Sequence, residues 1–282
     1  MKIFICTNEN QLIAAQVSKN SILKRSSISE KDINIVMESE VTELSNFHSK
    51  PYLRDGRKIN PDINDMQSFT LLRFLIPELM NFEGKALVLD PDIFLVKNGL
   101  EKLEHLNFGD SSIFARKGLK KDSWGSSVLL LSCDKLKHWS LRSLINELHQ
   151  CKIDYSDLIN LRYENSVSPL ETKWNEFDEI REDTILLHTT ERLTQPWRAG
   201  LKLNSSIEPI LKFIPRVPIY KFFGKDLTVG REHPSKDVTK FFFKELSECI
   251  SKGIIKMHDI DKAIAKNFLR HDLKDQLENH SN

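Results

Sequence analysis

Short apolar segments alternate with segments of helical periodicity along the first 190 residues, and this alternation constrains the fold more than any other feature. An apolar run of about four to eight residues between turn residues is typical of a buried strand, whereas apolar residues three or four positions apart are typical of a helix. The predicted strands are 2–6, 33–37, 85–89, 111–115, 126–131 and 184–187. The predicted helices between them are 12–23, 66–80 and 136–151, with Pro77 expected to kink or end the second. Strands that alternate with helices indicate an α/β fold with a mainly parallel sheet.

The last part of the chain has a different pattern. From about residue 236 onward the periodicity is helical only, over 236–252 and 259–277, and we predict a C-terminal helical extension. Residues 45–66 are polar and contain Pro51, Gly56 and Pro61, so we predict a loop there. Three consecutive phenylalanines, 241–243, are predicted to pack a helix onto the domain, with a partner or membrane surface as the alternative.

Composition excludes several classes of protein. The 282 residues include 41 Lys and Arg against 40 Asp and Glu, and this balance argues against a dedicated nucleic-acid binder. No apolar run approaches the length of a membrane span, and the apolar stretch at the N-terminus is too short for a signal peptide. Four cysteines without a CxxC spacing favour free thiols. We therefore expect a cytoplasmic protein without a transmembrane segment.

Two carboxylates follow the most apolar strand directly. The strand 85–89 ends at Asp90, Pro91 and Asp92, and in open α/β sheets ligands bind outside the carboxyl ends of the strands. Two carboxylates at this spacing repel each other unless a divalent cation with a preference for oxygen ligands lies between them. The alternative is an Asp-Pro turn that caps a helix.

A histidine occupies the corresponding position on another predicted strand. His188 follows the apolar residues 184–187, and if this strand shares a sheet with 85–89, Asp90, Asp92 and His188 converge. Two carboxylates and an imidazole suit manganese, with magnesium tolerated. The alternative is a histidine that only satisfies local hydrogen bonds.

Residues 73–79 and 84–93 together resemble the core of family 8 glycosyltransferases, the glycogenin-like and galactosyltransferase-like retaining enzymes with a GT-A fold. Residues 125–128 resemble that family's Asn-Ser-Gly-Val strand, 173–175 its Lys-Trp-Asn, and 188–197 its late His…Lys-Pro-Trp motif. The resemblance covers roughly residues 1–200. It implies a Rossmann-like nucleotide-sugar-binding catalytic domain over 1–200, with helices on both faces of the sheet, and leaves 201–282 as the extension.

The resemblance also implies roles for individual residues. Its metal ligands correspond to Asp90, Asp92 and His188, and its late histidine completes the metal site. The residues matched to donor binding are Thr7, Asn8, Arg73, Asp90, Ser126, Gln195 and Trp197. Asp157 and Arg73 are the implied catalytic residues, with Asp157 facing the reacting sugar. Thr7 and Asn8 have a turn and helix cap as their alternative, and Trp197 a core anchor.

The sequence departs from the family pattern at several positions. Gln195 stands where a phosphate-binding lysine is usual, and Arg192 or Arg198 could supply the charge. Tyr155 and Ser156 replace the Asp-Gln pair before Asp157.

The resemblance implies a retaining hexosyltransferase. Its donor is a nucleotide-sugar, expected to be a UDP-hexose, its acceptor is a carbohydrate or other hydroxyl compound, and its cofactor is Mn²⁺ or Mg²⁺. Two rivals remain: a catalytically inactive nucleotide-sugar binder or scaffold of the same fold, and a metal-dependent phosphohydrolase. Peripheral membrane contact and the oligomeric state stay open.

Overall fold

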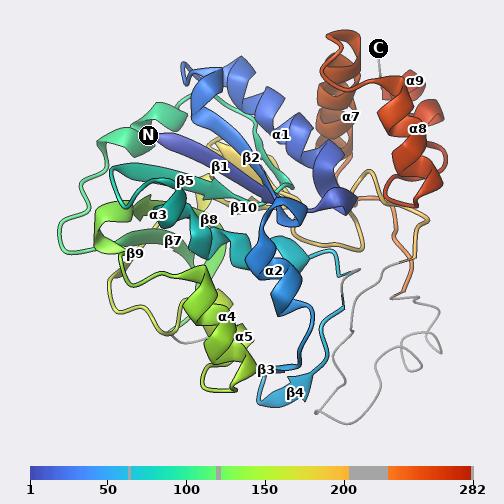
Figure 1. Ribbon diagram of the computed structural model, residues 1–282. Helices are drawn as coiled ribbons and strands as arrows, with labels where there is room; N and C mark the ends of the chain where they lie inside the picture. Colours follow the sequence, from blue (N-terminus) through green and yellow to red (C-terminus); the bar gives the residue numbers. More distant parts are fainter. Residues whose placement is uncertain (63–64, 119–121, 203–227, 281–282) are drawn as a thin grey trace. The chain divides into compact units, whose positions relative to one another are not determined.

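The computed structural model describes residues 1–62, 65–118, 122–202 and 228–280 (Figure 1). The chain divides into two compact units by its internal contacts. The first comprises Met1–Ile63, Gln67–Glu176 and Arg181–His188, and the second comprises Asn64–Met66, Phe177–Ile180 and Thr189–Asn282.

A six-stranded sheet forms the centre of the first unit. Its strands lie in the order β2 (Ile33–Met37), β1 (Lys2–Thr7), β5 (Lys85–Leu89), β8 (Trp124–Ser132), β7 (Ile113–Lys117) and β9 (Val167–Pro169). The pairs β1–β2, β1–β5 and β7–β9 are parallel, and β8 runs antiparallel to both of its neighbours. One reversed strand in an otherwise co-directional sheet confirms the predicted mixed, mainly parallel α/β fold.

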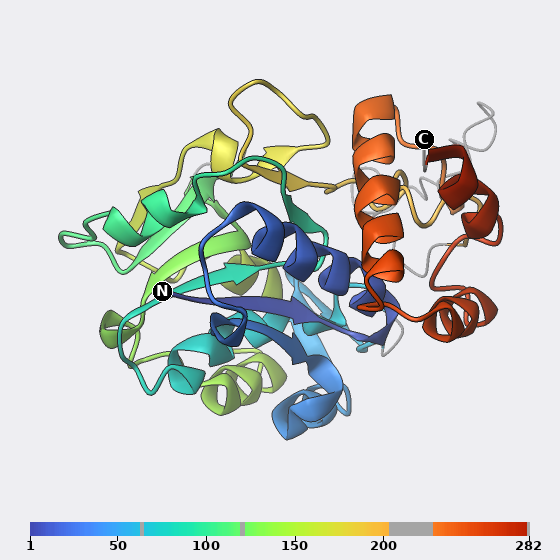
Figure 2. The same cartoon turned by 90° about the horizontal axis from the view of Figure 1, so that it is seen from above.

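Alternate residues of the central strands build a core on each face of the sheet. Ile3 and Ile5 of β1 pack with Ile22 of helix α1, whereas Phe4 of β1 packs with Phe74 on the other face. The α1 helix (blue) lies beside β1 in both views (Figures 1 and 2). The α-helices of this unit are α1 (Leu12–Arg25), α2 (Thr42–Phe47), α3 (Ile76–Leu79), α4 (Leu141–His149) and α5 (Tyr155–Ile159). The helices α2, α4 and α5 all contribute to the core that contains Phe4 and Phe74, and α1 contributes to the core on the opposite face. Helices therefore cover both faces of the sheet, as predicted.

Short 3-10 helices and two small sheets complete this part of the chain. The 3-10 helices are η1 (Glu9–Gln11), η2 (Glu30–Asp32), η3 (Glu38–Glu40), η4 (Ser68–Leu75), η5 (Leu100–His105), η6 (Cys133–Lys135) and η7 (Thr172–Trp174). The small sheets are a three-stranded one, β10 (Glu176–Phe177), β11 (Leu186–His188) and β6 (Ile93–Leu95), and a hairpin of β3 (Tyr52–Arg54) and β4 (Arg57–Ile59).

The second unit contains the predicted C-terminal helical extension, in the helices α7 (Lys236–Ser251), α8 (Met257–Ala265) and α9 (Leu273–His280). Ser235 caps α7 by accepting a hydrogen bond from the Val238 backbone N–H. Phe242 and Phe243 are fully buried, and Trp197 packs against Phe242 at 4.5 Å between ring centroids, so these phenylalanines pack within the second unit. No described helix has the length and apolar character needed to cross a membrane.

Several predicted boundaries are wrong. The segment 66–80 is a 3-10 helix, η4, followed by one turn of α-helix, α3, and Pro77 lies at the start of α3 because its fixed φ suits a first turn. The predicted helix 259–277 is two helices, because Asn267 adopts a left-handed conformation (φ 59°) after α8. The predicted loop 45–66 contains the end of α2 and the β3–β4 hairpin.

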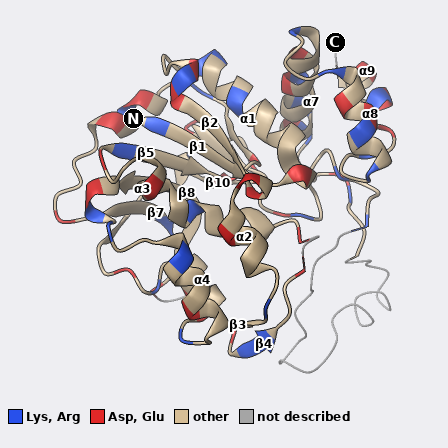
Figure 3. Ribbon diagram, in the orientation of Figure 1, with Lys and Arg blue, Asp and Glu red and all other residues tan. Residues whose placement is uncertain are grey.

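Charged residues of both signs are interspersed along the helices and loops (Figure 3). This distribution agrees with the near-zero net charge of the chain.

Candidate metal and nucleotide-binding site

A tight turn holds the two carboxylates at the end of β5. The Ile93 backbone N–H donates a hydrogen bond to the Asp90 carbonyl oxygen at 3.3 Å, so residues 90–93 close a four-residue turn. Pro91 occupies the second position of this turn, where its fixed φ is favourable. The turn keeps Asp90 and Asp92 within one loop of backbone, and β6 begins directly afterwards.

His188 reaches the same place through a different strand pairing from the one predicted. The sequence argument assumed that the strands before Asp90 and His188 share one sheet, and this assumption is wrong. Strand β11 belongs to the small sheet and pairs antiparallel with β6, which places His188 opposite Ile93, the residue after Asp92. One ligand atom from each of Asp90, Asp92 and His188 lies within 4.8 Å of the others, and all three residues are buried. The predicted convergence of these side chains is therefore confirmed.

Arg73 of η4 contacts this cluster through Asp90. Its Nε and Nη2 donate to Oδ1 of Asp90 at 3.0 and 2.7 Å, and Nη2 also lies 2.6 Å from Oδ2. The remaining nitrogen, Nη1, donates to Ser126 Oγ at 2.5 Å, and Ser126 in turn donates to the Ile159 carbonyl oxygen at 2.6 Å. Burial raises the pKa of the Asp90 carboxyl, and the Arg73 guanidinium opposes that rise.

The donor atoms of the cluster fit a divalent cation. Carboxylate oxygens and an imidazole nitrogen are ligands that manganese accepts, and magnesium accepts the oxygens. His188 Nε2 and Asp92 Oδ1 are 3.5 Å apart, which is longer than the usual N–H···O hydrogen bond. Asp90, Asp92 and His188 would hold the ion between them.

Thr7 and Asn8 lie at the end of β1, beside the ends of β2 and β5. The Asn8 side chain makes no capping hydrogen bond to η1, which disfavours the helix-cap alternative. Its Nδ2 donates to Ser68 Oγ at 3.0 Å, and Ser68 donates to the Glu38 carboxylate. The other Glu38 oxygen lies 2.5 Å from His48 Nε2. The network thus connects the residue after β1 with η4, with η3 and with the residue after α2.

Glu38 and Ser68 are polar residues of this edge that the sequence argument missed. Glu38 follows strand β2 directly, and this is the same signal that marked Asp90 after β5. Ser68 carries no comparable signal, because only the path of η4 brings it to Asn8.

Asp157 lies on α5, the helix whose last residue, Ile159, accepts the hydrogen bond from Ser126. Its carboxylate pairs with Arg162 at 2.6 Å and is about one-third exposed. It is not one of the three groups that converge at the cluster. Tyr155, on the same helix, is buried and packs its ring 5.2 Å from that of Tyr52.

Gln195 and Trp197 lie in the second unit. Gln195 Nε2 donates to the Thr189 carbonyl oxygen at 3.4 Å. Trp197 is 1% exposed and packs against Phe242, as the core-anchor alternative predicts. Their predicted role in donor binding is taken up below as a proposal.

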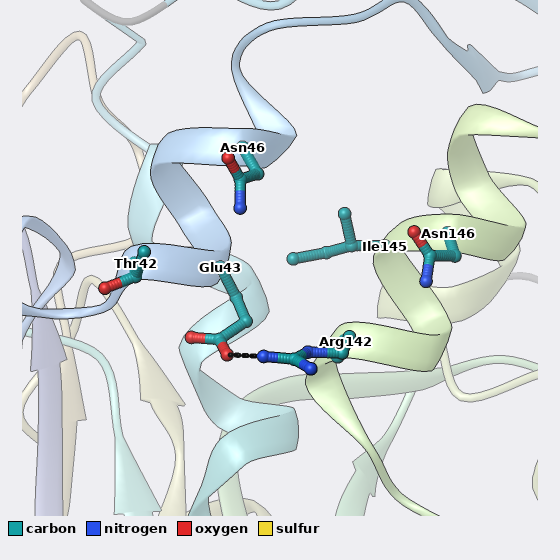
Figure 4. A pocket seen from close by; sticks show the side chains of 6 residues that line it. All are labelled: Thr42, Glu43, Asn46, Arg142, Ile145 and Asn146. Carbon is teal, nitrogen blue, oxygen red and sulfur yellow. Dashed lines mark hydrogen bonds and ion pairs between the residues drawn. The ribbon is translucent and has the colours of Figure 1, made fainter.

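A separate cavity of about 470 Å³ lies between α2 and α4 (Figure 4). An ion pair between Glu43 and Arg142, at 3.5 Å, crosses it. The residues that line it are Thr42, Glu43, Asn46, Arg142, Ile145 and Asn146. None of them belongs to the Asp–Asp–His cluster or to the Asn8 network.

No protein-family model matches the sequence, and no curated protein matches it. Among solved structures, the chain is similar to the galactosyltransferase LgtC in complex with donor and acceptor sugar analogs, at 16% identity over 81% of this chain and 97% of that chain, with a TM-score of 0.48. It is also similar to the glycosyltransferase GlyE of Streptococcus pneumoniae TIGR4, at 15% identity over 90% of this chain and 63% of that one, with a TM-score of 0.49. For mouse xyloside xylosyltransferase 1 the identity is 10%, the coverage 67% and 97%, and the TM-score 0.43.

A likeness of this degree concerns the path of the chain and carries no functional information. The described chain is a mixed α/β protein with a buried Asp–Asp–His cluster at the edge of its sheet where β1, β2 and β5 end.

Proposed function

We propose that this chain is a metal-dependent glycosyltransferase of the GT-A type. It transfers a hexose from a nucleotide-sugar, with a UDP-hexose as the expected donor, to a hydroxyl acceptor with retention of configuration. The observation that carries the proposal is the meeting of Asp90, Asp92 and His188 within 4.8 Å at the end of β5. The catalytic domain would span residues 1–200 and the extension 201–282.

Cleavage of a sugar–diphosphate bond leaves extra negative charge on the departing phosphate. A divalent cation held by the cluster supplies Lewis-acid stabilisation of that charge when it is bound. Arg73 holds Asp90 in place through both carboxylate oxygens, so that the acidic pair is ordered before the donor arrives. Ser126 fixes the opposite side of the same guanidinium.

Other residues are proposed to bind the donor or to act at the sugar. Thr7 and Asn8 would bind the nucleoside, since they lie at the end of β1 next to the cluster strand β5. Gln195 and Trp197 are assigned to the donor by sequence resemblance alone. Asp157 would stabilise the positive charge that develops at the reacting sugar carbon.

A second candidate function is a catalytically inactive nucleotide-sugar binder or scaffold. The ion pair between Asp157 and Arg162 favours this alternative, because a guanidinium 2.6 Å from Oδ1 offsets the negative charge that would stabilise a sugar cation. The buried Tyr155 favours it too, since its ring packs in the core where the resembling family has a polar residue.

The test is a panel of nucleotide-sugars incubated with the purified chain, with Mn²⁺ or with EDTA. Proton NMR identifies the free or transferred sugar and its anomeric configuration as it first forms. We expect Mn²⁺-dependent release from one donor with retention. Stabilisation by UDP and Mn²⁺ without any sugar release would instead establish the binder. Cleavage of simple phosphate esters at a higher rate than any nucleotide-sugar would support a phosphohydrolase. The cytoplasmic location stays a prediction.

A further inference from the structure

Asn175 and Ser127 surround the imidazole nitrogen of His188 that faces away from the carboxylates. Asn175 follows η7 and is fully buried. Its Oδ1 lies 2.9 Å from His188 Nδ1, and its Nδ2 donates to Ser127 Oγ at 3.1 Å. Ser127 Oγ lies 3.3 Å from the same imidazole nitrogen. The three side chains form a closed triangle of polar contacts.

The hydrogen bonds within this triangle select one tautomer of the imidazole. The structure has the Asn175 amide nitrogen toward Ser127 and the amide oxygen toward His188, and a carbonyl oxygen only accepts a hydrogen bond. His188 Nδ1 therefore carries the hydrogen. In the neutral imidazole, which is the form that ligates a metal, the lone pair is then on Nε2, the nitrogen that lies 3.5 Å from Asp92 Oδ1. An imidazole lone pair and a carboxylate oxygen that face each other are the arrangement in which a cation between them stabilises both.

Two hydrogen bonds of the Asn175 backbone hold the residue in this position. The Asn175 N–H donates to the Thr172 carbonyl oxygen at 2.8 Å, and the Asn175 carbonyl oxygen accepts a short hydrogen bond from the Arg116 guanidinium. The preceding residue, Trp174, is buried in the core that also contains Leu89 of β5. The backbone of Asn175 is thus held at both its N–H and its carbonyl oxygen.

Ser127 also connects this triangle to the acidic turn. Its carbonyl oxygen accepts the hydrogen bond from the Asp90 N–H at 3.0 Å. The preceding residue, Ser126, holds Arg73. Two consecutive residues of β8 therefore contact the partners of two cluster residues. Ser126 contacts Arg73, which binds Asp90, and Ser127 contacts Asn175, which binds His188.

We propose that Asn175 and Ser127 are positioning residues that hold His188 as a preformed cation ligand. They touch neither cation nor substrate and act through the imidazole. A partner of this kind fixes the tautomer and orientation of a ligating histidine. The inference rests on the proposed function, because it concerns the cation site of the same reaction.

The test measures Mn²⁺ affinity directly, by titration followed by electron paramagnetic resonance, on the full chain and without a donor. Asn175→Leu removes the amide at nearly constant size, and we expect about 10- to 100-fold weaker Mn²⁺ binding. Asn175→Asp keeps an acceptor for the Nδ1 hydrogen and should retain affinity close to that of the parent. The electron spin-echo modulation from an imidazole nitrogen on Mn²⁺ should be present in the parent and in Asn175→Asp, and weak or absent in Asn175→Leu.

Asn20→Leu is the matched control, because Asn20 is also buried but lies on α1. It should leave Mn²⁺ affinity unchanged even if it lowers stability. If Asn175→Leu does not fold, Ser127→Ala provides the second variant, with a smaller loss of Mn²⁺ affinity expected.

Parent-like Mn²⁺ affinity and an intact nitrogen signal in a folded Asn175→Leu or Ser127→Ala variant would overturn the inference and leave the proposed function standing. A parent protein that binds no Mn²⁺ would overturn the metal site of the proposed function, and the inference with it.

Discussion

The Arg73 guanidinium binds Asp90 through both carboxylate oxygens, with contacts of 2.6 to 3.0 Å between buried side chains. Asp92, two residues away, instead lies beside His188. The two carboxylates of the turn thus have different surroundings: one is already paired with a fixed positive charge, and the other faces an imidazole. This asymmetry determines what each side chain contributes to stability and, in the proposed function, to ion binding.

The buried pair should contribute strongly to stability. Arg73→Leu leaves Asp90 buried without its counter-charge, and we expect the free energy of unfolding to fall by about 3–5 kcal/mol. Urea denaturation measures this change. The control is Arg162→Leu, which breaks the partly exposed pair with Asp157 and should cost no more than about 1 kcal/mol. Equal losses in the two variants would contradict the assignment of Arg73 as the buried counter-charge.

Asp157 should affect the chemical step and not ion binding. Asp157→Asn keeps the shape of the side chain and removes its charge, so we expect sugar transfer to slow by about 100-fold, comparable to the loss of a transition-state contact. Mn²⁺ and UDP affinities should stay at the parent values. Arg162→Gln breaks the same ion pair while retaining the carboxylate, and it should keep transfer within a few-fold of the parent. A parent-like transfer rate in Asp157→Asn would remove this residue from the mechanism.

Gly230 should tolerate no side chain. A Cβ at this position would lie 2.3 Å from the carbonyl oxygen of Arg198, a backbone atom that cannot rotate away. We expect Gly230→Ala to lower the unfolding free energy of the second unit by about 1–3 kcal/mol or more. Gly125→Ala is the control, since its nearest contact would be an ordinary 3.6 Å. A melting temperature for Gly230→Ala equal to that of Gly125→Ala would contradict this account.

The Arg270–Asp272 pair predicts a pH dependence of stability. Hydrogen bonds from Arg270, at 2.6 and 2.8 Å, lower the pKa of the Asp272 carboxyl. An unfolded aspartate has a pKa of about 3.9, so the pair stabilises the fold fully above that pH and loses its contribution as pH falls through the lower folded pKa. The melting-temperature difference between the parent and Asp272→Asn should therefore be largest near neutral pH and shrink toward pH 3. A difference that grows on acidification would contradict the sign of this shift.

The sequence predicts local features of this site well. The end of an apolar strand and the two carboxylates after it lie within a few residues, and the structure has β5 at the predicted bounds, Lys85–Leu89. The β2 strand also matches its prediction, Ile33–Met37. The β5 strand is predictable because burial on both faces imposes a continuous apolar run, whereas β2 is an edge strand and mostly half-buried.

Several features that depend on distant contacts were not predicted, although the convergence of Asp90, Asp92 and His188 was. Asn175 lies 13 residues from His188, and only the small sheet, in which β10 directly after Asn175 neighbours β11, brings the amide to the imidazole. The 3-10 character of η4 was also missed, since an apolar periodicity of three to four residues fits both kinds of helix. Arg73 was assigned from resemblance, whereas its contact with Ser126 follows from the chain path alone.

Calorimetric titration of UDP tests the central claim most directly: Asp90, Asp92 and His188 hold a divalent cation that binds a nucleoside diphosphate. The titration compares the parent with Asp92→Ala, each with Mn²⁺ and with EDTA. We expect the parent to bind UDP tightly only with Mn²⁺, and Asp92→Ala to show the same weak binding in both conditions while remaining folded. UDP affinity in Asp92→Ala that matches the parent and still depends on Mn²⁺ would contradict the account.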